Sequence, residues 1–363
     1  MKRILITGAG GTPSTNFVRS LRVSSENFYL IGVDCNEYSL HRAETNEKYL
    51  VPHPTHNDYL PILKEIIQET KPALIYSQPD QEIYAISKIR KELRDEYKLR
   101  VFLPEHKTIE LCQDKFASYL KWKEAGLKVP ETMRINNEDD LKIAVDKFGT
   151  PVWVRATFSP GGGMGSFRAE NYNVARAWID FCNGWGSFTA AECLKPDSIT
   201  WMSLWKNGEL IVGQGRKRLY WELGNRAPSG VTGITGTGIT VSDPIVDEIA
   251  LKTIMAVDNH PNGIFSVDLT YDKDGIPNPT EINIGRFFTT HYFFTSCGLN
   301  MPYIFVKLAF DEDVSSFIPK KINPLTPGLA WIRGMDFLPV LTDEKTIRLY
   351  KEELEKRRHN LQK

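Results

Sequence analysis

The chain has 363 residues, 41% of them hydrophobic and 25% charged, which favours a globular protein of two or three domains. Its formal net charge is zero, so bulk charge does not indicate a nucleic-acid or membrane-surface partner, and none is expected. No apolar run approaches the roughly 20 residues that span a bilayer. The five cysteines are scattered and form no CxxC pattern, which is typical of free thiols in a reducing cytoplasm. We therefore predict a cytoplasmic location.

The first hundred residues alternate between strand and helix patterns. Apolar runs predict strands over 4–6, 29–34, 72–77 and 100–103, and helical periodicity predicts helices over 15–23, 58–70 and 81–97. This β-α-β order implies a parallel sheet with helices on both faces.

The pattern changes after residue 108. Helices are predicted over 114–125, 138–148 and 171–183, and strands over 188–194, 199–205, 209–216, 263–272 and 280–284. Seven glycines between 213 and 238 predict a mobile loop there. The end, 343–359, reads as an amphipathic helix with Ile347, Tyr350 and Leu354 facing inward. The overall fold class is thus α/β followed by α+β.

The segment "ITGAGGTPS" (6–14) resembles a dinucleotide-binding turn, with Asp34 in the place of the ribose-binding acid. However, the third glycine of that fingerprint should fall at position 13, which is proline. We interpret the segment as a tight strand-to-helix turn in a Rossmann-like domain. An NAD(P)-dependent oxidoreductase is the least favoured of the alternatives.

A second glycine cluster follows a predicted strand in "VWVRATFSPGGGMGS" (152–166). Arg155 ends the strand, and the glycines would let backbone N–H groups approach an anion closely. No GK[ST] follows, so this is not a Walker A loop. By itself the segment is equally compatible with a phosphate-binding loop and with a surface turn.

Two further strands alternate polar and apolar residues. In "FSVDLTY" (265–271) Asp268 lies on the polar face, and in "TEINI" (280–284) Glu281 and Asn283 do so. If the two strands pair, these three side chains gather into an all-oxygen cluster. Carboxylate and amide oxygens are the ligands that Mg²⁺ prefers beside substrate phosphates.

Four segments in this order, "DK…AGLKVP" (114–130), "PVWVRA…GGGMG" (151–165), "AECL…D" (191–197) and "VDL…EIN" (267–283), resemble the ATP-grasp superfamily. The chain is particularly similar to single-chain proteins that correspond to one half of the carbamoyl phosphate synthase large subunit, over roughly residues 1–310. The resemblance implies a Rossmann-like pre-ATP-grasp domain followed by a two-subdomain ATP-grasp fold. Members mostly join a carboxylate to an amine through an acyl phosphate.

The resemblance also implies roles for individual residues. Lys115 and Arg155 would hold the ATP phosphates, and Asp197 would bind the ribose. Metal ligands would be Asp268, Glu281 and Asn283. The remaining nucleotide contacts would be a lid made by Gly161, Gly162, Gly163 and Gly165, and an adenine hinge made by Glu192, Cys193 and Leu194.

One departure concerns the arginine that stabilises the transferring phosphoryl group. The family commonly has it two residues after the asparagine, whereas here Gly285 intervenes and Arg286 comes three residues after Asn283. A further basic residue, Arg218 in "GRKRLYW", is a candidate for binding an anionic substrate, although a solvated strand edge explains it equally well.

From these observations we predict an ATP-dependent carboxylate–amine ligase that uses two Mg²⁺ ions, for which Mn²⁺ can substitute. Its partners would be a small-molecule carboxylate and an amine, and the resemblance allows a homodimer. The predicted units are 1–108, 109–187, 188–310 and a C-terminal extension, 311–363. The alternatives are phosphorylation of a small carboxylate as in carbamoyl phosphate synthase, and a nucleotide-binding protein without turnover.

Overall fold

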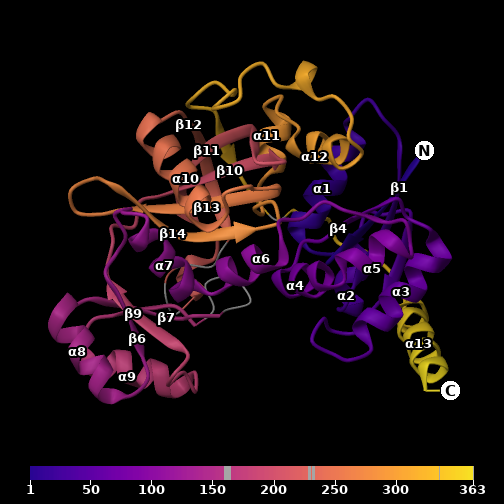
Figure 1. Ribbon diagram of the computed structural model, residues 1–363. Coiled ribbons are helices and arrows are strands. Elements are labelled where there is room, and N and C mark those ends of the chain that lie inside the picture. The colour runs from indigo at the N-terminus through magenta and orange to yellow at the C-terminus, as the bar shows by residue number, and fades with distance from the viewer. Residues whose placement is uncertain (159–164, 228–229, 231–233, 335, 363) are drawn as a thin grey trace.

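A computed structural model describes residues 1–158, 165–227, 230, 234–334 and 336–362, and these residues contain three sheets (Figure 1). The first sheet is parallel, in the order β3-β2-β1-β4-β5. Its strands are β1 (Lys2–Thr7), β2 (Phe28–Asp34), β3 (Glu47–Leu50), β4 (Leu74–Tyr76) and β5 (Arg100–Val101). Its helices are α1 (Thr12–Arg22), α2 (Glu37–Arg42), α3 (Tyr59–Thr70), α4 (Asp80–Lys88) and α5 (Arg90–Asp95). The predicted parallel α/β unit is confirmed.

The second sheet is antiparallel, in the order β6-β9-β7-β8. It consists of β6 (Thr132–Ile135), β7 (Val152–Ala156), β8 (Phe167–Ala169) and β9 (Phe188–Glu192), with α8 (Glu138–Phe148) and α9 (Tyr172–Phe181) beneath it in Figure 1. Helices α6 (His106–Gln113) and α7 (Lys115–Glu124) precede it. Its buried side chains form a hydrophobic cluster of their own, so this unit is packed separately from the other two sheets.

The third sheet is antiparallel, in the order β14-β13-β10-β11-β12-β15. Its strands are β10 (Ser198–Lys206), β11 (Glu209–Trp221), β12 (Thr235–Val241), β13 (Gly263–Tyr271), β14 (Pro277–Ile284) and β15 (Ala330–Ile332). The associated helices are α10 (Pro244–Val257), α11 (Tyr292–Ser296) and α12 (Met301–Ala309), with 3-10 turns η1 (Gly224–Arg226) and η2 (Ser315–Phe317).

The first and third sheets share their cores. Phe17 of α1 stacks on Tyr76 with ring centroids 3.8 Å apart, and both rings contact Phe305 of α12. Burial of such aromatic side chains is the main force that holds elements together. Helix α6 bridges the same two units, because it packs on both α4 and β14 (Figure 1). The carboxyl edge of the parallel sheet is thereby fixed against the end of β14.

The predicted mobile loop over 213–238 is wrong for the described residues of that range, most of which lie in β11 and β12. The glycines make room for large neighbours. A Cβ on Gly213 would lie 2.3 Å from Cζ2 of Trp201, and a Cβ on Gly238 would lie 2.9 Å from Cδ of Arg216. These side chains cross the strands above the bare backbone, so the glycine content reflects close packing.

Replacing Gly213 with alanine is therefore expected to lower the free energy of unfolding by about 1–3 kcal/mol, because the new methyl group overlaps the buried Trp201 ring. A thermal melt measures the loss. Gly334→Ala is the matched control, since the Cβ it adds has no non-adjacent atom of the described residues within 4 Å. Equal melting temperatures for the two variants would contradict the packed-strand description.

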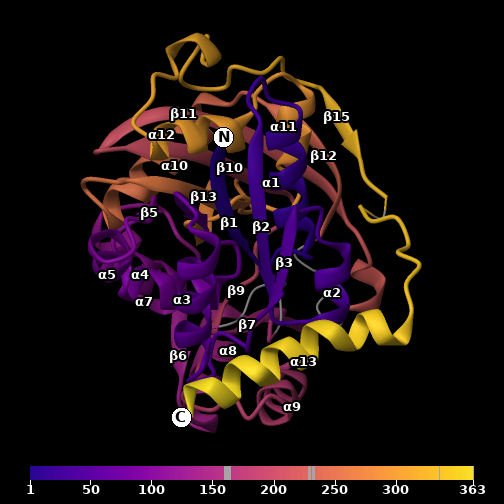
Figure 2. The same ribbon diagram turned by 90° about the vertical axis from the view of Figure 1, so that its right-hand side faces the viewer.

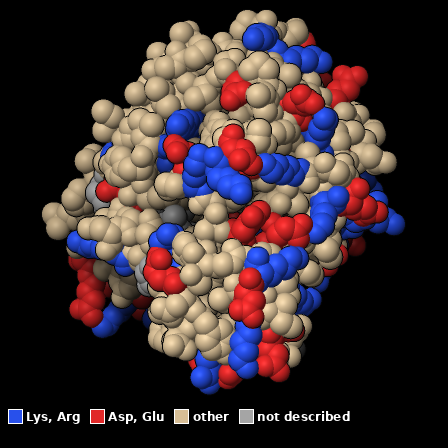
Figure 3. Space-filling view, turned by 90° about the vertical axis from the view of Figure 1, so that its left-hand side faces the viewer, with Lys and Arg blue, Asp and Glu red and all other residues tan. Residues whose placement is uncertain are grey.

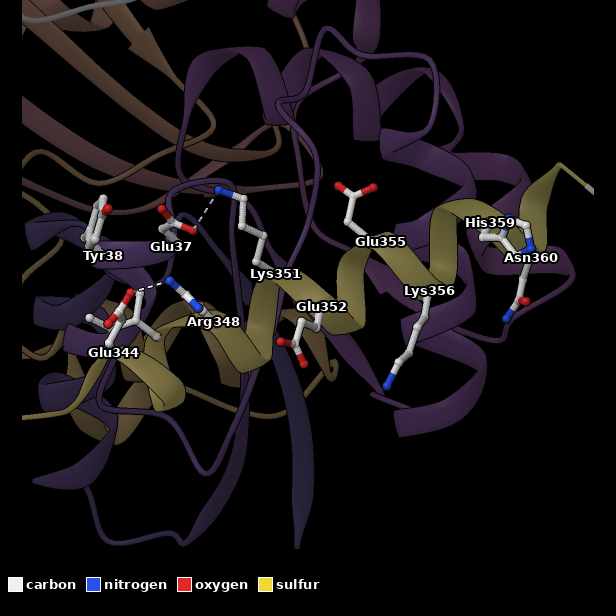
Figure 4. A pocket seen from close by; sticks show the side chains of 11 residues that line it. Glu37, Tyr38, Glu344, Arg348, Lys351, Glu352, Glu355, Lys356, His359 and Asn360 are labelled. Carbon is white, nitrogen blue, oxygen red and sulfur yellow. Dashed lines mark hydrogen bonds and ion pairs between the residues drawn. The ribbon is translucent and has the colours of Figure 1, made fainter.

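The C-terminal helix α13 (Glu344–Leu361) lies along the first unit (Figure 2). As predicted, one side faces inward: Leu354 is buried, and the half-buried Tyr350 packs on His41 with ring centroids 5.1 Å apart. A shallow groove with mostly charged walls separates α13 from α2 (Figure 4). Within it Lys351 Nζ lies 3.6 Å from a carboxylate oxygen of Glu37, an ion pair that ties the two helices together.

All five cysteines are free. Among the described residues, no helix is both long enough and apolar enough to cross a membrane. The face drawn in Figure 3 carries basic and acidic side chains in small interspersed groups, in keeping with the zero net charge.

Candidate active site

A row of polar side chains crosses four strands of the third sheet. The register places Arg216 of β11 opposite Thr200 of β10, Thr200 opposite Asp268 of β13, and Asp268 opposite Glu281 of β14. Directly paired residues in neighbouring strands share one face of the sheet. Asn283 follows on the same face of β14, two residues after Glu281. The predicted pairing of the strands that carry Asp268, Glu281 and Asn283 is thus observed.

Three basic side chains converge on Glu281. Its Oε1 atom lies 3.7 Å from Nζ of Lys115, and Arg155 and Arg286 also act on its charge. Burial would raise the pKa of Glu281, but these positive charges outweigh it and hold the pKa below its ordinary value. Glu281 is therefore ionised at neutral pH, the state in which a carboxylate binds a metal cation.

Local structure explains how Lys115 and Arg155 reach this point. Asp114 caps α7 by accepting hydrogen bonds from the N–H groups of Phe116 and Ala117, so Lys115 stands at the first position of the helix. Its own N–H donates to the carbonyl of Thr157 just beyond β7, at 3.0 Å. On β7, Arg155 donates to the carbonyl of Thr280 at 3.0 Å. The first contact joins α7 to the end of β7, and the second joins β7 to β14 of the third sheet.

Arg286 reaches the same cluster despite the additional residue. Gly285 has a φ of +73°, a conformation that glycine adopts readily, and the chain turns there. Arg286 then donates to Asn283 Oδ1 at 2.5 Å and makes a two-pronged contact with Asp80 at the start of α4, at 2.6 and 3.2 Å. A planar fork of this kind fixes the orientation of the guanidinium. Asp80 was not singled out from the sequence.

Hydrogen bonds link the cluster into one chain. Arg216 donates to the hydroxyl of Thr200 at 2.7 Å, and Thr200 donates to Asp268 at 2.5 Å. The other oxygen of Asp268 accepts from the amide of Asn283 at 3.1 Å. Asn283 is in turn held by Arg286, so β11, β10, β13 and β14 are connected through to α4. Such a network fixes the positions of its members more firmly than isolated pairs would.

The donor set can be tested against magnesium. Among the described residues, no group of three or more His, Cys, Asp or Glu side chains could hold a metal ion. Asp268 and Glu281 contribute two carboxylates, and the third candidate, Asn283, is an amide. Oxygen donors alone, with one carboxylate held ionised by neighbouring cations, are compatible with a hard cation that also binds phosphate oxygens.

A cavity of about 180 Å³ opens beside this cluster. Its walls include the side chains of Lys115, Glu281, Asn283 and Arg286, together with Asp80 and the exposed Phe158 at the end of the described part of that segment. The cavity lies where the three units meet, which is a common location for small-molecule sites.

The structure describes only part of the glycine-rich segment. Gly161, Gly162 and Gly163 lie outside the described residues. Gly165 is described: it has a φ of +76°, and a Cβ there would lie 3.2 Å from the Cβ of Ala156. Its carbonyl accepts a hydrogen bond from the indole of Trp178 at 3.2 Å, which anchors the C-terminal end of the segment on α9.

The residues that the resemblance assigns to adenine and ribose lie at the end of β9 and in the connector to β10. Glu192 ends β9 and is exposed, and its carboxylate accepts from the N–H of Glu131 at 3.1 Å. Cys193 and Leu194 follow as half-buried residues of the connector to β10. Asp197 pairs with Lys217 at 3.1 Å. The roles of these four residues stay predictions.

Two arginines of β11 stand beside the acidic pair. Arg218 donates to the hydroxyls of Ser198 and Thr235 at 2.8 and 3.0 Å, and its guanidinium lies over the ring of Trp221. Arg216, two residues earlier on the same face, is 2% exposed and donates to Thr200 and Thr290. Sequence reasoning named Arg218 and missed Arg216. The R-x-R spacing within a strand, which places both residues on one face, was the available signal.

In the dinucleotide-like turn, the carboxylate of Asp34 binds backbone N–H groups of the protein itself. Asp34 is 6% exposed and accepts from the N–H of Gly10 at 2.9 Å and from that of Asn36 at 2.9 Å. A Cβ on Gly10 would lie 1.8 Å from the carbonyl oxygen of Ser39, so α2 covers the turn. The carboxylate therefore holds the backbone of the turn, which does not favour a ribose-binding role for Asp34.

Close to this turn, Glu82 is buried in the first turn of α4. Burial raises its pKa to about 8, although Thr7 and Tyr59 partly oppose the shift. The folded protein therefore holds a proton that the unfolded chain loses near its ordinary pKa of 4.5. The stabilisation from this carboxyl is complete below pH 4.5 and is lost as the pH rises to about 8.

Because glutamine cannot titrate, Glu82→Gln is expected to flatten the pH dependence of stability. Between pH 4.5 and 8 the melting temperature of the native protein should fall relative to that of the variant. The exposed change Glu96→Gln in the same unit serves as control. Parallel melting curves for Glu82→Gln and the native protein across this range would refute the assignment.

The arrangement of the three sheets is a fold that solved carboxyaminoimidazole ribonucleotide synthase and biotin carboxylase structures share. Residues 4–98 match the family described as PylC-like, N-terminal domain. No curated protein matches the sequence significantly.

Solved structures of similar fold cover most of the chain. Carboxyaminoimidazole ribonucleotide synthase from Aspergillus clavatus, complexed with ATP, has a TM-score of 0.66 and 16% identity over 89% of this chain and 80% of that one. A biotin carboxylase complex with β,γ-ATP from Campylobacter jejuni has a TM-score of 0.68 and 15% identity over 87% and 72%. N5-carboxyaminoimidazole ribonucleotide synthetase from Thermotoga maritima has a TM-score of 0.60 and 19% identity over 87% and 77%. At such identities the likeness establishes the fold.

Proposed function

We propose that the protein is an ATP- and magnesium-dependent ligase that joins a carboxylate to an amine through an acyl phosphate. The observation that carries the proposal is the convergence of Lys115, Arg155 and Arg286 on Glu281, within reach of Asp268 and Asn283. Phosphoryl transfer needs positioning and charge neutralisation more than covalent help from the protein, and this cluster offers both. The fold is shared with proteins whose structures were solved with ATP or ADP.

In this proposal the γ-phosphoryl group of ATP passes to a carboxylate oxygen, giving ADP and an acyl phosphate. The amine then attacks the carbonyl carbon, phosphate leaves, and the amine nitrogen loses a proton. Lys115, Arg155 and Arg286 stabilise the negative charge on the phosphoryl oxygens during transfer. Arg286 is suited to this because its fork on Asp80 fixes the guanidinium before substrate arrives.

Asp268, Glu281 and Asn283 would hold magnesium, which would neutralise charge on the phosphate oxygens. A relative of the same fold was solved with the magnesium salt of ADP, which supports the choice of metal. The use of two ions and the substitution by Mn²⁺ stay predictions. Gly161, Gly162, Gly163 and Gly165 are proposed to cover the phosphates, with Glu192, Cys193 and Leu194 at the adenine and Asp197 at the ribose.

We also propose partners, an assembly state, a location and unit boundaries for the protein. These are a small-molecule carboxylate and amine as partners, assembly as a homodimer, a cytoplasmic location based on the free cysteines, and the unit boundaries 1–108, 109–187, 188–310 and 311–363. The described residues of β9 pair with β6 and β7, so Phe188–Glu192 belong to the second sheet in space.

Nucleotide choice gives the first test of the proposal. ATP with Mg²⁺ is expected to raise the melting temperature of the protein, because binding to the folded state alone stabilises it, and removal of Mg²⁺ with a chelator should cancel most of the rise. NAD⁺ and NADP⁺ serve as the matched comparison. Stabilisation by NAD(P) and none by ATP–Mg²⁺ would overturn the proposal in favour of an oxidoreductase.

A further inference from the structure

Of the residues that the structure describes, no acidic side chain is in direct contact with either arginine of β11. Among the described residues, the hydrogen bonds of Arg216 go to the hydroxyls of Thr200 and Thr290, and those of Arg218 go to hydroxyls as well. Neither guanidinium takes part in an ion pair within 4.0 Å in the described part of the chain. The buried Nε atom of Arg216 has no hydrogen-bond partner among the residues that the structure describes. Buried cations without a paired anion are energetically costly unless a ligand supplies the charge.

Both arginines lie where they can act together. They are two residues apart on one face of β11, and aromatic rings support their guanidinium planes: Phe288 lies 4.4 Å from that of Arg216, and Trp221 lies 3.5 Å from that of Arg218. Burial and the charge of Arg218 lower the pKa of Arg216 to about 9. This mutual repulsion would be relieved by a negative group bound between the two side chains.

The excess of positive charge at the site also favours binding of an anionic group. The interacting charged groups of this face and its edge that the structure describes include five cations, Lys115, Arg155, Arg216, Arg218 and Arg286, and three carboxylates, Asp80, Asp268 and Glu281. Two positive charges are left over. ATP with two magnesium ions carries no net charge, so the nucleotide alone would not compensate them. A substrate with two negative charges would.

The register of the strands sets the distance between the arginines and the proposed metal ligand Asp268. Arg216 and Asp268 stand two strands apart, which corresponds to about 10 Å between their backbones. Their side chains both lean toward Thr200, which hydrogen-bonds to each of them. A carboxylate at the proposed metal side and an anionic group at the arginines would thus be separated by a short carbon chain.

We propose that Arg216 and Arg218 form a binding site for a second anionic group of the substrate, a carboxylate or a phosphate, so that the carboxylate substrate is a dianion. This inference rests on the proposed ligase function for the role of the first carboxylate. It goes beyond the prediction for Arg218 by adding Arg216 and by fixing the charge of the substrate.

The test compares matched pairs of acids that differ by one anionic group: butyrate with succinate, alanine with aspartate, and serine with phosphoserine. Thermal shifts are measured at constant ionic strength, with and without ADP–Mg²⁺. At least one dianion is expected to stabilise the protein more than its match, and the pair that responds distinguishes a carboxylate from a phosphate. Equal shifts within all three pairs would overturn the inference.

Variants of the two arginines test whether dianion binding depends on them. Arg218→Gln keeps a donor for Ser198 but removes the charge, and it should weaken binding of the responding dianion by about tenfold or more. Arg216→Gln should do the same, but the buried position makes its folding a separate question, so Arg218→Gln is the primary variant. Lys252→Gln on the surface of α10 also removes one positive charge and should leave binding unchanged. Unchanged dianion affinity in Arg218→Gln would contradict the site.

Failure of the inference and failure of the ligase proposal are distinguishable. If the dianions discriminate but ADP–Mg²⁺ does not bind, the anion site stands and the ligase function falls. If ADP–Mg²⁺ binds with equal affinity in the native protein and in Arg218→Gln while the members of each pair act alike, the ligase function stands and the dianion inference falls.

Discussion

Replacing Glu281 with glutamine is expected to lower ATP turnover by a factor of about 10²–10³ while leaving the fold intact. Glutamine has nearly the same shape but carries no charge, so it would bind a magnesium ion poorly and leave Lys115, Arg155 and Arg286 without their shared counter-charge. The change removes the charge of a carboxylate on which all three cations act. Release of ADP under saturating ATP measures the loss.

Two controls make the Glu281 result interpretable. Glu352→Gln is the same chemical change at an exposed position of α13 and should turn over ATP like the native protein. A thermal melt of Glu281→Gln checks that the fold survives, because removing a half-buried acid among cations also costs some stability. A folded variant with native turnover would refute the metal assignment.

The second large effect is expected from Arg286. Arg286→Met should lower the rate of ADP release by a factor of about 10²–10³, because it removes a fixed cation that stabilises charge in the transition state. Affinity for ATP–Mg²⁺ should change much less than the rate, since Lys115 and Arg155 would still hold the phosphates. Rate and affinity are therefore measured separately.

Arg286→Lys is the matched variant, because it keeps the positive charge and loses the planar fork on Asp80. It should recover part of the rate that methionine loses. Asp80→Asn tests the same fork from the other side: it should reduce the rate more mildly, because Arg286 remains but is less firmly oriented. Equal rates for Arg286→Met and the native protein would exclude Arg286 from the chemistry.

Much of this fold could be predicted from local patterns. Alternation of strand and helix over the first hundred residues predicted the parallel sheet, and period-two alternation around Asp268 and Glu281 predicted two paired strands with their acids on one face. Both patterns are short in range and depend on which side of an element is buried. The amphipathic C-terminal helix was predicted for the same reason.

Contacts between distant segments could not be predicted in this way. Asp80 holds Arg286 from 206 residues away, and nothing near either residue indicates the pairing. The glycines of β11 and β12 were misinterpreted because the large side chains that require them come from neighbouring strands. Trp201 covers Gly213, and Arg216 covers Gly238. Glycine content alone does not separate a loose segment from a tightly packed one.

Arg216 also could not be recognised as a site residue from the sequence. In the sequence it is one of three basic residues in "GRKR", and such a run usually marks a solvated face. In the structure it is 2% exposed and part of a hydrogen-bonded chain that ends on Asp80. Its importance depends on the register of β11 against β10, which tertiary structure sets.

Trapping of an acyl phosphate tests the central proposal most directly. The protein is incubated with ATP, Mg²⁺, pooled carboxylic acids that include the dianions above, and hydroxylamine in place of the natural amine. We expect release of ADP together with a hydroxamate of one acid, and both should be lost in Glu281→Gln. Failure to bind ATP–Mg²⁺, or ADP release that no acid stimulates and that yields no hydroxamate, would contradict the proposal.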